Sequence, residues 1–190
     1  FTVYSYDRSG VDITDAGAVE RVIAAIGAEL VVNTAAYNMV DVAENEPQAA
    51  FQVNALAVRN MALACRQAGA KLVHFSTDYV FDGTKGSAYT EDDRPHPLGA
   101  YAVSKLCGEL YARAYLDDLL VLRTSGEVRG GGAAFLRLAR AAERSRATVL
   151  VAGDGTVAVP GALTVRLARL RPCWTGMPGT FLVLLGTEAT

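Results

Sequence analysis

Short apolar runs alternate with longer stretches of helical periodicity along most of the chain. The apolar runs, each bounded by polar or small residues, predict strands. These runs are FTVYSY, ELVVNTA, KLVHFST, LLVLRTS and ATVLVAG. Between them, apolar positions recur every three or four residues, which predicts amphipathic helices. The predicted helices cover about 15–28, 47–70, 98–116 and 133–145.

Residues at the helix boundaries support these assignments. Asp15 is a candidate N-cap, because its carboxylate can accept a hydrogen bond from a free backbone N–H in the first turn. Pro47 suits the first turn of the second helix, and Gly69 marks that helix's end. The strand–helix alternation and the near-continuous apolar strands indicate a parallel sheet with helices on both faces. The expected fold is therefore an α/β doubly wound parallel sheet.

Polar and small residues follow the predicted strands. In a parallel sheet of this kind, ligands bind outside the carboxyl ends of the strands, so these residues are candidates for a binding site. They are Asp7 and Arg8 after the first strand, Ala35, Ala36, Tyr37 and Asn38 after the second, Ser76, Thr77 and Asp78 after the third, and Thr124 and Ser125 after the fourth.

Tyr101 and Lys105 lie four residues apart, which puts both side chains on one face of the predicted helix 98–116. An ammonium near a phenol favours the phenolate and lowers the pKa of the phenol, so the pair can exchange a proton with a carbonyl or alcohol oxygen. The hydroxyls of Ser76 and Thr77 could reach the same point. A hydride would have to come from a cofactor. The alternative is an amphipathic helix with Tyr101 packed on the sheet and Lys105 in solvent.

The composition is that of an ordinary globular protein, with 51% hydrophobic residues, 20% charged residues and a net charge of −2. A chain of 190 residues is long enough for one domain with a core and short for two. No basic groove with interleaved aromatic residues is present, so nucleic acid is not an expected partner. No apolar run has the ~18 residues of a membrane helix, so no membrane partner is expected. Three scattered cysteines fit a reducing cytoplasm.

Three acidic residues, Asp41, Glu44 and Glu46, lie near the start of the helix 47–70. We interpret them as helix caps and complements of the helix dipole. We accordingly predict no metal ion held by the protein.

Three segments resemble the extended short-chain dehydrogenase/reductases, and within them the dTDP-4-dehydrorhamnose reductases. They are VVNTAAYNMVDVAENEP, VNALAVRNMALACRQAGAKLVHFSTDYVFDGT and PLGAYAVSKLCGEL, and the similarity extends over about residues 1–125. The resemblance implies a Rossmann-like NAD(P)-binding domain over 1–152 and a partial substrate-binding region over 153–190. It also implies the NAD(P)H-dependent reduction of a 4-keto nucleotide sugar, dTDP-4-dehydro-L-rhamnose, to dTDP-L-rhamnose. A homodimer is compatible with it.

The resemblance also assigns roles to individual residues. Tyr101 would donate the proton, Lys105 would lower its pKa and hold the nicotinamide ribose, and Thr77 would bind the keto oxygen. Thr77, Asp78 and Tyr101 would face the substrate. The residues expected along the cofactor are Asp12 and Ile13 at its adenine end, Ala35, Ala36, Tyr37, Asn38 and Ser76, together with Tyr101 and Lys105.

Asp7 and Arg8 point to different cofactors. A carboxylate at the end of this strand suits the free ribose hydroxyls of NADH, whereas an arginine beside it can bind the 2′-phosphate of NADPH. We expect NADPH, with NADH as the alternative.

The chain departs from this family in three places. It lacks the family's first strand and glycine-rich turn, so we expect either a gap between the strands FTVYSY and ELVVNTA or direct pairing of the two, in a fragment of a longer chain. Gly126 to Arg129 replace an aromatic segment, and the substrate-binding region is short. An alternative is therefore a non-catalytic regulatory or binding subunit on the same fold, resembling the regulatory β subunit of methionine adenosyltransferase, or an inactive fragment. The intact Thr77, Tyr101 and Lys105 favour the enzyme.

Overall fold

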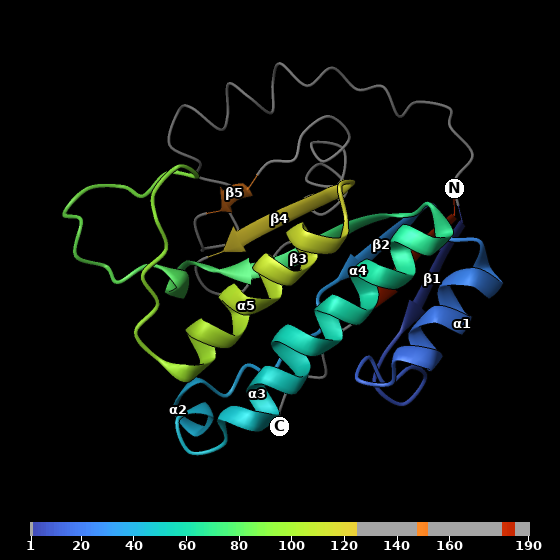
Figure 1. Ribbon diagram of the computed structural model, residues 1–190, viewed down its shortest axis with the longest axis horizontal. Helices are drawn as coiled ribbons and strands as arrows, with labels where there is room; N and C mark the ends of the chain where they lie inside the picture. The colour runs from blue at the N-terminus through green and yellow to red at the C-terminus, as the bar shows by residue number, and fades with distance from the viewer. Residues whose placement is uncertain (1, 125–147, 152–179, 185–190) are drawn as a thin grey trace.

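The computed structural model of the protein describes residues 2–124, 148–151 and 180–184, and Figure 1 shows how its elements are arranged. The strands are β1 (Thr2–Tyr6), β2 (Leu30–Asn33), β3 (Lys71–Thr77), β4 (Leu119–Thr124), β5 (Thr148–Val151) and β6 (Thr180–Leu184). The helices are α1 (Ala16–Ile26), α2 (Val40–Ala43), α3 (Pro47–Phe51), α4 (Ala57–Ala68) and α5 (Ala100–Tyr115), with a π-helical turn η1 (Gln52–Leu56) and a 3-10 turn η2 (Asp78–Val80). All five predicted strands are confirmed. The helix predicted at 133–145 lies outside the described residues.

The strands form one parallel sheet in the order β1-β6-β2-β3-β4-β5. The parallel sheet expected from the strand–helix alternation is therefore confirmed. Helices α1, α4 and α5 lie side by side on one face of this sheet (Figure 1). Because the strands are parallel, the carboxyl ends of neighbouring strands lie at one edge, which is where a ligand is expected.

The strand β6 lies between β1 and β2 and pairs with both of them. Leu182, for example, is opposite Tyr4 of β1 and Val31 of β2. The predicted gap and the predicted direct pairing of the two strands are both wrong. The apolar run at 180–184 supplies the hydrogen-bonding partner that β1 and β2 would otherwise lack, and it does so from the far end of the sequence. The C-terminal region thus adds a strand to the sheet.

The helix predicted over 47–70 consists of three consecutive segments, α3, η1 and α4. Pro47 lies in the first turn of α3, and Gly69 ends α4 in the left-handed conformation, as predicted. The π-helical turn in the middle contains Asn54, whose side chain is buried. Turns of this kind are rare and often mark functional sites.

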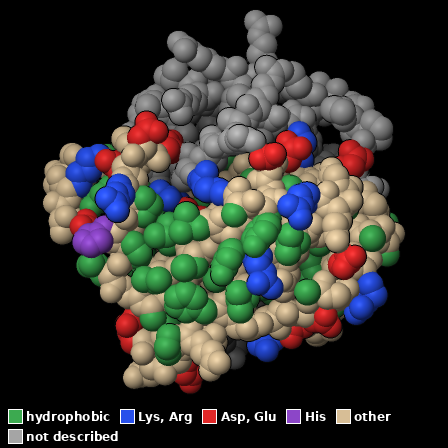
Figure 2. All heavy atoms as spheres, viewed as in Figure 1, with side chains coloured by type: hydrophobic (Ala, Val, Ile, Leu, Met, Phe, Trp, Pro, Cys, Tyr) green, Lys and Arg blue, Asp and Glu red, His purple; other side chains and the backbone are tan. Residues whose placement is uncertain are grey.

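A hydrophobic core fills the space between the sheet and the helices. Its fully buried side chains include Ile23 of α1, Met61 of α4, Leu72 of β3 and Val121 of β4. Asp15 caps α1 by accepting a hydrogen bond from the Ala18 N–H at 3.0 Å, as predicted. Figure 2 shows hydrophobic side chains on the outer face of the helical layer. Leu110 of α5 is 57% exposed. None of the described helices combines the length and hydropathy needed to span a bilayer.

Candidate active site

The end of β3 and the first turn of α5 bring Thr77 and Tyr101 together. Tyr101 is 8% exposed, and its phenol lies close enough to the Thr77 hydroxyl for the two to interact. Thr77 Oγ1 donates to Asp78 Oδ1 at 3.3 Å and accepts from the Tyr79 N–H at 3.2 Å. Burial raises the pKa of the Tyr101 phenol, the Thr77 hydroxyl opposes this shift, and the nearby Asp78 and Tyr79 add to it. The sequence interpretation, in which Lys105 lowers the pKa of Tyr101, differs from this structure because burial of the phenol outweighs the other influences.

Lys105 lies one helical turn after Tyr101 and is 3% exposed. Its Nζ donates a hydrogen bond to the backbone carbonyl of Phe75 at 2.7 Å. Burial lowers the pKa of Lys105 to about 8, while the charge of Glu109 opposes that shift. The alternative in which Lys105 lies in solvent is therefore wrong. An ammonium has three N–H donors, so the Phe75 bond leaves Lys105 with capacity to hold a ligand oxygen.

The hydroxyl of Ser76 points to a different partner from the one the sequence suggested. Its Oγ donates to Oε1 of Glu109 at 2.6 Å, and the same carboxylate accepts two hydrogen bonds from Arg123. Ser76, Glu109 and Arg123 are all buried. The Ser76 side chain therefore points toward α5 and donates its hydroxyl proton to Glu109. It does not hydrogen-bond with Thr77 or Tyr101.

Sequence reasoning missed Glu109 and Arg123, although the chain carries a signal for each. Glu109 comes four residues after Lys105 and therefore lies on the same helix face. Arg123 interrupts the apolar strand LLVLRT, and a charge in such a strand is rarely buried without a partner.

Asn54 is a further buried polar residue that sequence reasoning missed. Its side chain accepts a hydrogen bond from the Tyr37 N–H at 2.8 Å and donates to the Tyr37 carbonyl and the Ser104 hydroxyl, both at 3.0 Å. Ser104 in turn donates to the Tyr101 carbonyl at 2.7 Å. Asn54 thereby connects the turn after β2 with the helix that carries Tyr101 and Lys105.

The residues after β2 border this region. Ala35 is buried, its N–H bonding to Asn33 Oδ1 at 3.0 Å, while Ala36 is half-buried and Asn38 is exposed. Tyr37 packs against the small apolar cluster that contains Tyr101. Its hydroxyl donates to Glu46 at 3.2 Å, and desolvation raises the pKa of Tyr37.

The acidic residue Glu44 caps α5 from outside that helix. Its Oε1 accepts a hydrogen bond from the Ala100 N–H at 2.6 Å, while Gly99, the N-cap residue, has no side chain to do so. The prediction of a capping role holds for Glu44, but the helix it caps is α5 rather than 47–70. Among the described residues, no three His, Cys, Asp or Glu side chains are grouped as metal ligands.

The predicted cofactor residues after β1 lie apart from Tyr101, because β6 and β2 separate β1 from β3 in the sheet. Asp7 and Arg8 are exposed, and Asp7 accepts hydrogen bonds from the N–H and hydroxyl of Ser9 at 2.9 and 2.6 Å. Asp12 accepts two hydrogen bonds from Thr14. The neighbouring Ile13 is 8% exposed and belongs to the core.

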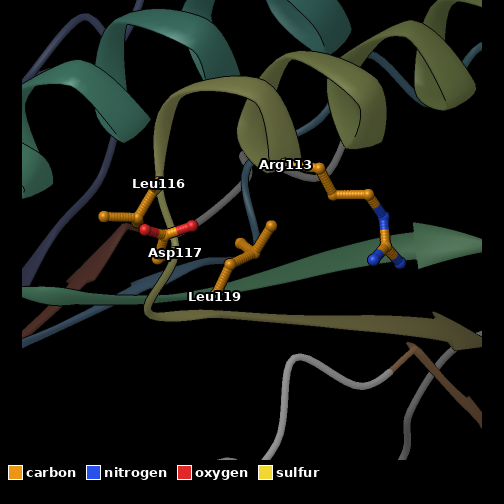
Figure 3. Close-up of a pocket in the computed structure, with 4 residues that line it drawn as sticks. All are labelled: Arg113, Leu116, Asp117 and Leu119. Atoms are coloured by element: carbon orange, nitrogen blue, oxygen red, sulfur yellow. The ribbon is translucent and has the colours of Figure 1, made fainter.

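A small pocket lies at the other end of α5, lined by Arg113, Leu116, Asp117 and Leu119 (Figure 3). Leu119 begins β4, so this pocket lies at the amino edge of the sheet. Since ligands bind such sheets at the carboxyl edge, where Thr77 ends β3, we place the candidate active site there and not in this pocket.

Comparisons with known proteins show which family this chain resembles. The family described as RmlD substrate binding domain matches residues 1–167. The dTDP-4-dehydrorhamnose reductase of Mycolicibacterium smegmatis is 41% identical over 160 residues, covering 83% of this chain and 46% of that protein. The dTDP-4-dehydrorhamnose reductase of Streptomyces griseus is 39% identical over 188 residues, covering 98% of this chain and 58% of that protein.

A solved structure shares the fold. The crystal structure of dTDP-4-dehydrorhamnose reductase from Bacillus anthracis in complex with NADP matches with a TM-score of 0.65 and 34% identity, over 76% of this chain and 52% of that one. The chain thus spans about half the length of the curated relatives it matches. Because the family match extends from the first residue to residue 167, the chain belongs to the RmlD substrate-binding domain family.

Proposed function

We propose that this chain carries the catalytic residues of an NADPH-dependent reductase of a 4-keto nucleotide sugar, converting dTDP-4-dehydro-L-rhamnose to dTDP-L-rhamnose. The observation that carries the proposal is the buried Tyr101, which lies beside Thr77 and is followed one turn later by the buried Lys105. Relatives named dTDP-4-dehydrorhamnose reductase support the substrate. The intact site argues against the non-catalytic alternative.

In this mechanism Tyr101 is the proton donor. The raised pKa of its phenol keeps the hydroxyl protonated at neutral pH, which is the state needed to protonate a carbonyl oxygen. Thr77 holds that oxygen by a hydrogen bond, and the proton passes from Tyr101 Oη to it as the alcohol forms. Lys105 is mostly charged below pH 8 and stabilises the phenolate left on Tyr101. NADPH, when bound, supplies the hydride.

The residues fit the two ends of such a cofactor. Near Tyr101, the free donor capacity of Lys105 suits the ribose hydroxyls beside the nicotinamide. After β1, Arg8 is exposed while the carboxylate of Asp7 is occupied by Ser9 and Gly10, which supports a 2′-phosphate and therefore NADPH over NADH. Residues 1–152 would form most of the cofactor-binding unit. The segment 153–190 would contain part of the substrate-binding region and also β6 (180–184), which belongs to the same sheet as the strands of 1–152.

Two variants test the role of Tyr101. Tyr101→Phe removes the proton donor, whereas Tyr79→Phe changes a 53% exposed tyrosine whose ring lies 6.0 Å from that of Tyr101. We expect Tyr101→Phe to abolish NADPH oxidation by dTDP-4-keto sugar with cofactor binding nearly unchanged, and Tyr79→Phe to keep most of the activity. Retention of most activity by Tyr101→Phe would show that the assigned role is wrong.

Cofactor binding is measured separately, by titrating the chain with NADPH and then NADH and following nicotinamide fluorescence. We expect NADPH to bind more tightly than NADH, and we expect the Arg8→Ala variant to lose this difference. A folded chain that binds neither cofactor would contradict the proposed function for this chain.

A further inference from the structure

Three pairs of residues connect α5 to the end of β3 along one helix face. Tyr101, Lys105 and Glu109 recur every four residues on α5 and contact Thr77, the Phe75 carbonyl and Ser76, respectively. The three partners are consecutive in β3. Tyr101 and Lys105 belong to the proposed chemistry, whereas Glu109 has no role in it so far.

Glu109 is held more firmly than the other two. Its carboxylate accepts hydrogen bonds from Arg123 Nε at 2.9 Å and Arg123 Nη2 at 2.7 Å, in addition to the Ser76 hydroxyl at 2.6 Å. Ser76 and Arg123 are directly opposite each other on β3 and β4. Glu109 is 1% exposed and Arg123 is 4% exposed.

A buried ion pair of this kind is weak evidence for stability. The free-energy cost of removing two charges from water is about as large as the free energy gained from their attraction. Within the part of the chain that the structure describes, Arg123 Nη1 has no hydrogen-bond partner, and the guanidinium lies 5.0 Å from the Phe81 ring centre. Well-packed apolar side chains of similar volume often replace a buried ion pair with no loss of stability. The pair therefore calls for a role other than stability.

The charge of Glu109 acts on Lys105. Both side chains are buried one turn apart on the same face, where electrostatic interactions are screened far less than at the surface. Among the described residues, the titratable groups near Lys105 come from three elements packed around it besides α5 itself. They are Glu109 and Tyr101 on α5, His74 on β3, Asp78 and Tyr79 of η2 next to Tyr101, and Arg123 on β4 next to Glu109, while η1 contributes the neutral Asn54. His74 is neutral, because burial and Lys105 lower its pKa well below its usual value. Glu109 is thus the negative charge that favours the ammonium form of Lys105.

We propose that Glu109 is a positioning residue for the reduction: fixed by Arg123 and Ser76, its carboxylate keeps Lys105 charged and aligns β3 with α5, so that Thr77 meets Tyr101. The catalytic part of this inference rests on the proposed function. The link between Glu109 and Lys105 can be tested without any activity.

The protein has three lysines, Lys71, Lys85 and Lys105, so NMR of the chain labelled with 13Cε-lysine gives three signals, assigned with Lys71→Arg and Lys85→Arg. We expect the titration midpoint of Lys105 to move to lower pH in Glu109→Gln, which removes the charge but keeps the shape. Glu20→Gln, a change at an exposed position of α1, is the control and leaves the midpoint unchanged. An unchanged midpoint in folded Glu109→Gln overturns the proposal.

Glu109→Gln leaves Arg123 without its carboxylate and could prevent folding. The double variant Glu109→Met with Arg123→Met removes both charges together and avoids that problem. It is expected to lower the Lys105 midpoint as well, and an unchanged midpoint in this variant again overturns the proposal.

If the chain reduces the keto sugar, Glu109→Gln should lower kcat about tenfold at pH 8, with KM nearly unchanged, and move the alkaline limb of the pH profile to lower pH. A chain without activity in which Lys105 still responds to Glu109→Gln would contradict the proposed function and leave the electrostatic link standing. Loss of activity with an unshifted pH profile and an unshifted Lys105 midpoint would contradict the link instead.

Discussion

Gly108 of α5 lies directly against the backbone carbonyl of Asn54 in the π-helical turn η1. A Cβ added to Gly108 would lie 2.1 Å from the Asn54 oxygen, far inside van der Waals contact. This close approach lets the side chain of Asn54 reach Ser104 on α5 while also holding the Tyr37 backbone. The glycine therefore determines how closely the turn after β2 and the proposed catalytic helix can pack.

We expect Gly108→Ala to destabilise the protein by about 2 kcal/mol, because the clash is with backbone and relieving it must move α5 or η1. The control is Gly17→Ala in α1, where the nearest atom is the flexible end of Arg21 at 3.1 Å. That change should be neutral or slightly stabilising. Urea unfolding of both variants measures the difference, and equal stabilities would show that this contact is unimportant.

Glu44→Ala should destabilise α5 by about 1 kcal/mol, since the Ala100 N–H loses the only hydrogen-bond acceptor that the described residues offer it. The effect should concentrate at the start of α5 and appear as faster hydrogen exchange of the first-turn amides, next to Tyr101. Asp41→Ala, at an exposed position of α2, is the matched control. If the first-turn amides of α5 exchange at the same rate in both variants as in the unchanged chain, Glu44 does not cap α5 in solution.

His74 should make the fold sensitive to mild acid. It is fully buried and its pKa is well below the usual 6.5, so the unfolded chain binds a proton that the folded chain does not. The contribution of His74 to stability is therefore complete above the unfolded pKa and is lost as the pH falls below about 6.5, with a slope of up to ~1.4 kcal/mol per pH unit.

Urea unfolding between pH 7 and pH 5 tests this sensitivity. We expect a shallower loss of stability in His74→Gln, whose amide oxygen can replace Nδ1 as the partner of Asn33. His96→Gln, which changes a histidine with a 72% exposed side chain, should keep the steep loss. Equal slopes in His74→Gln and the unchanged chain would contradict the prediction.

Deletion of residues 180–190 should abolish cooperative unfolding and promote aggregation. The deletion removes β6, leaving β1 with no strand partner among the described residues and exposing the edge of β2, whose Val31 and Val32 are buried in the intact sheet. Deletion of 185–190 keeps all of β6 and is the control. Circular dichroism and calorimetry compare the two, and a cooperative transition in the longer deletion would show that β6 is dispensable.

Local patterns determine the elements of this protein. The apolar runs predict all five strands that precede the C-terminal region, and Asp15, Pro47 and Gly69 correctly mark helix boundaries, because each depends on hydrogen bonds or backbone conformations within a few residues. The four-residue spacing likewise puts Tyr101 and Lys105 on one face of a helix. The sequence alone therefore determines a parallel α/β scaffold and its candidate catalytic pair.

Long-range packing decides the rest. The run at 180–184 shows no local sign that it lies between β1 and β2, since that position depends on hydrogen bonds to strands far away in the sequence. Packing against the sheet buries Lys105 and Tyr101 and sets the direction of their pKa shifts. It also buries the Glu109 carboxylate, which needs hydrogen-bond donors once water is excluded. Arg123 and Ser76 supply them, so the Ser76 hydroxyl points toward Glu109.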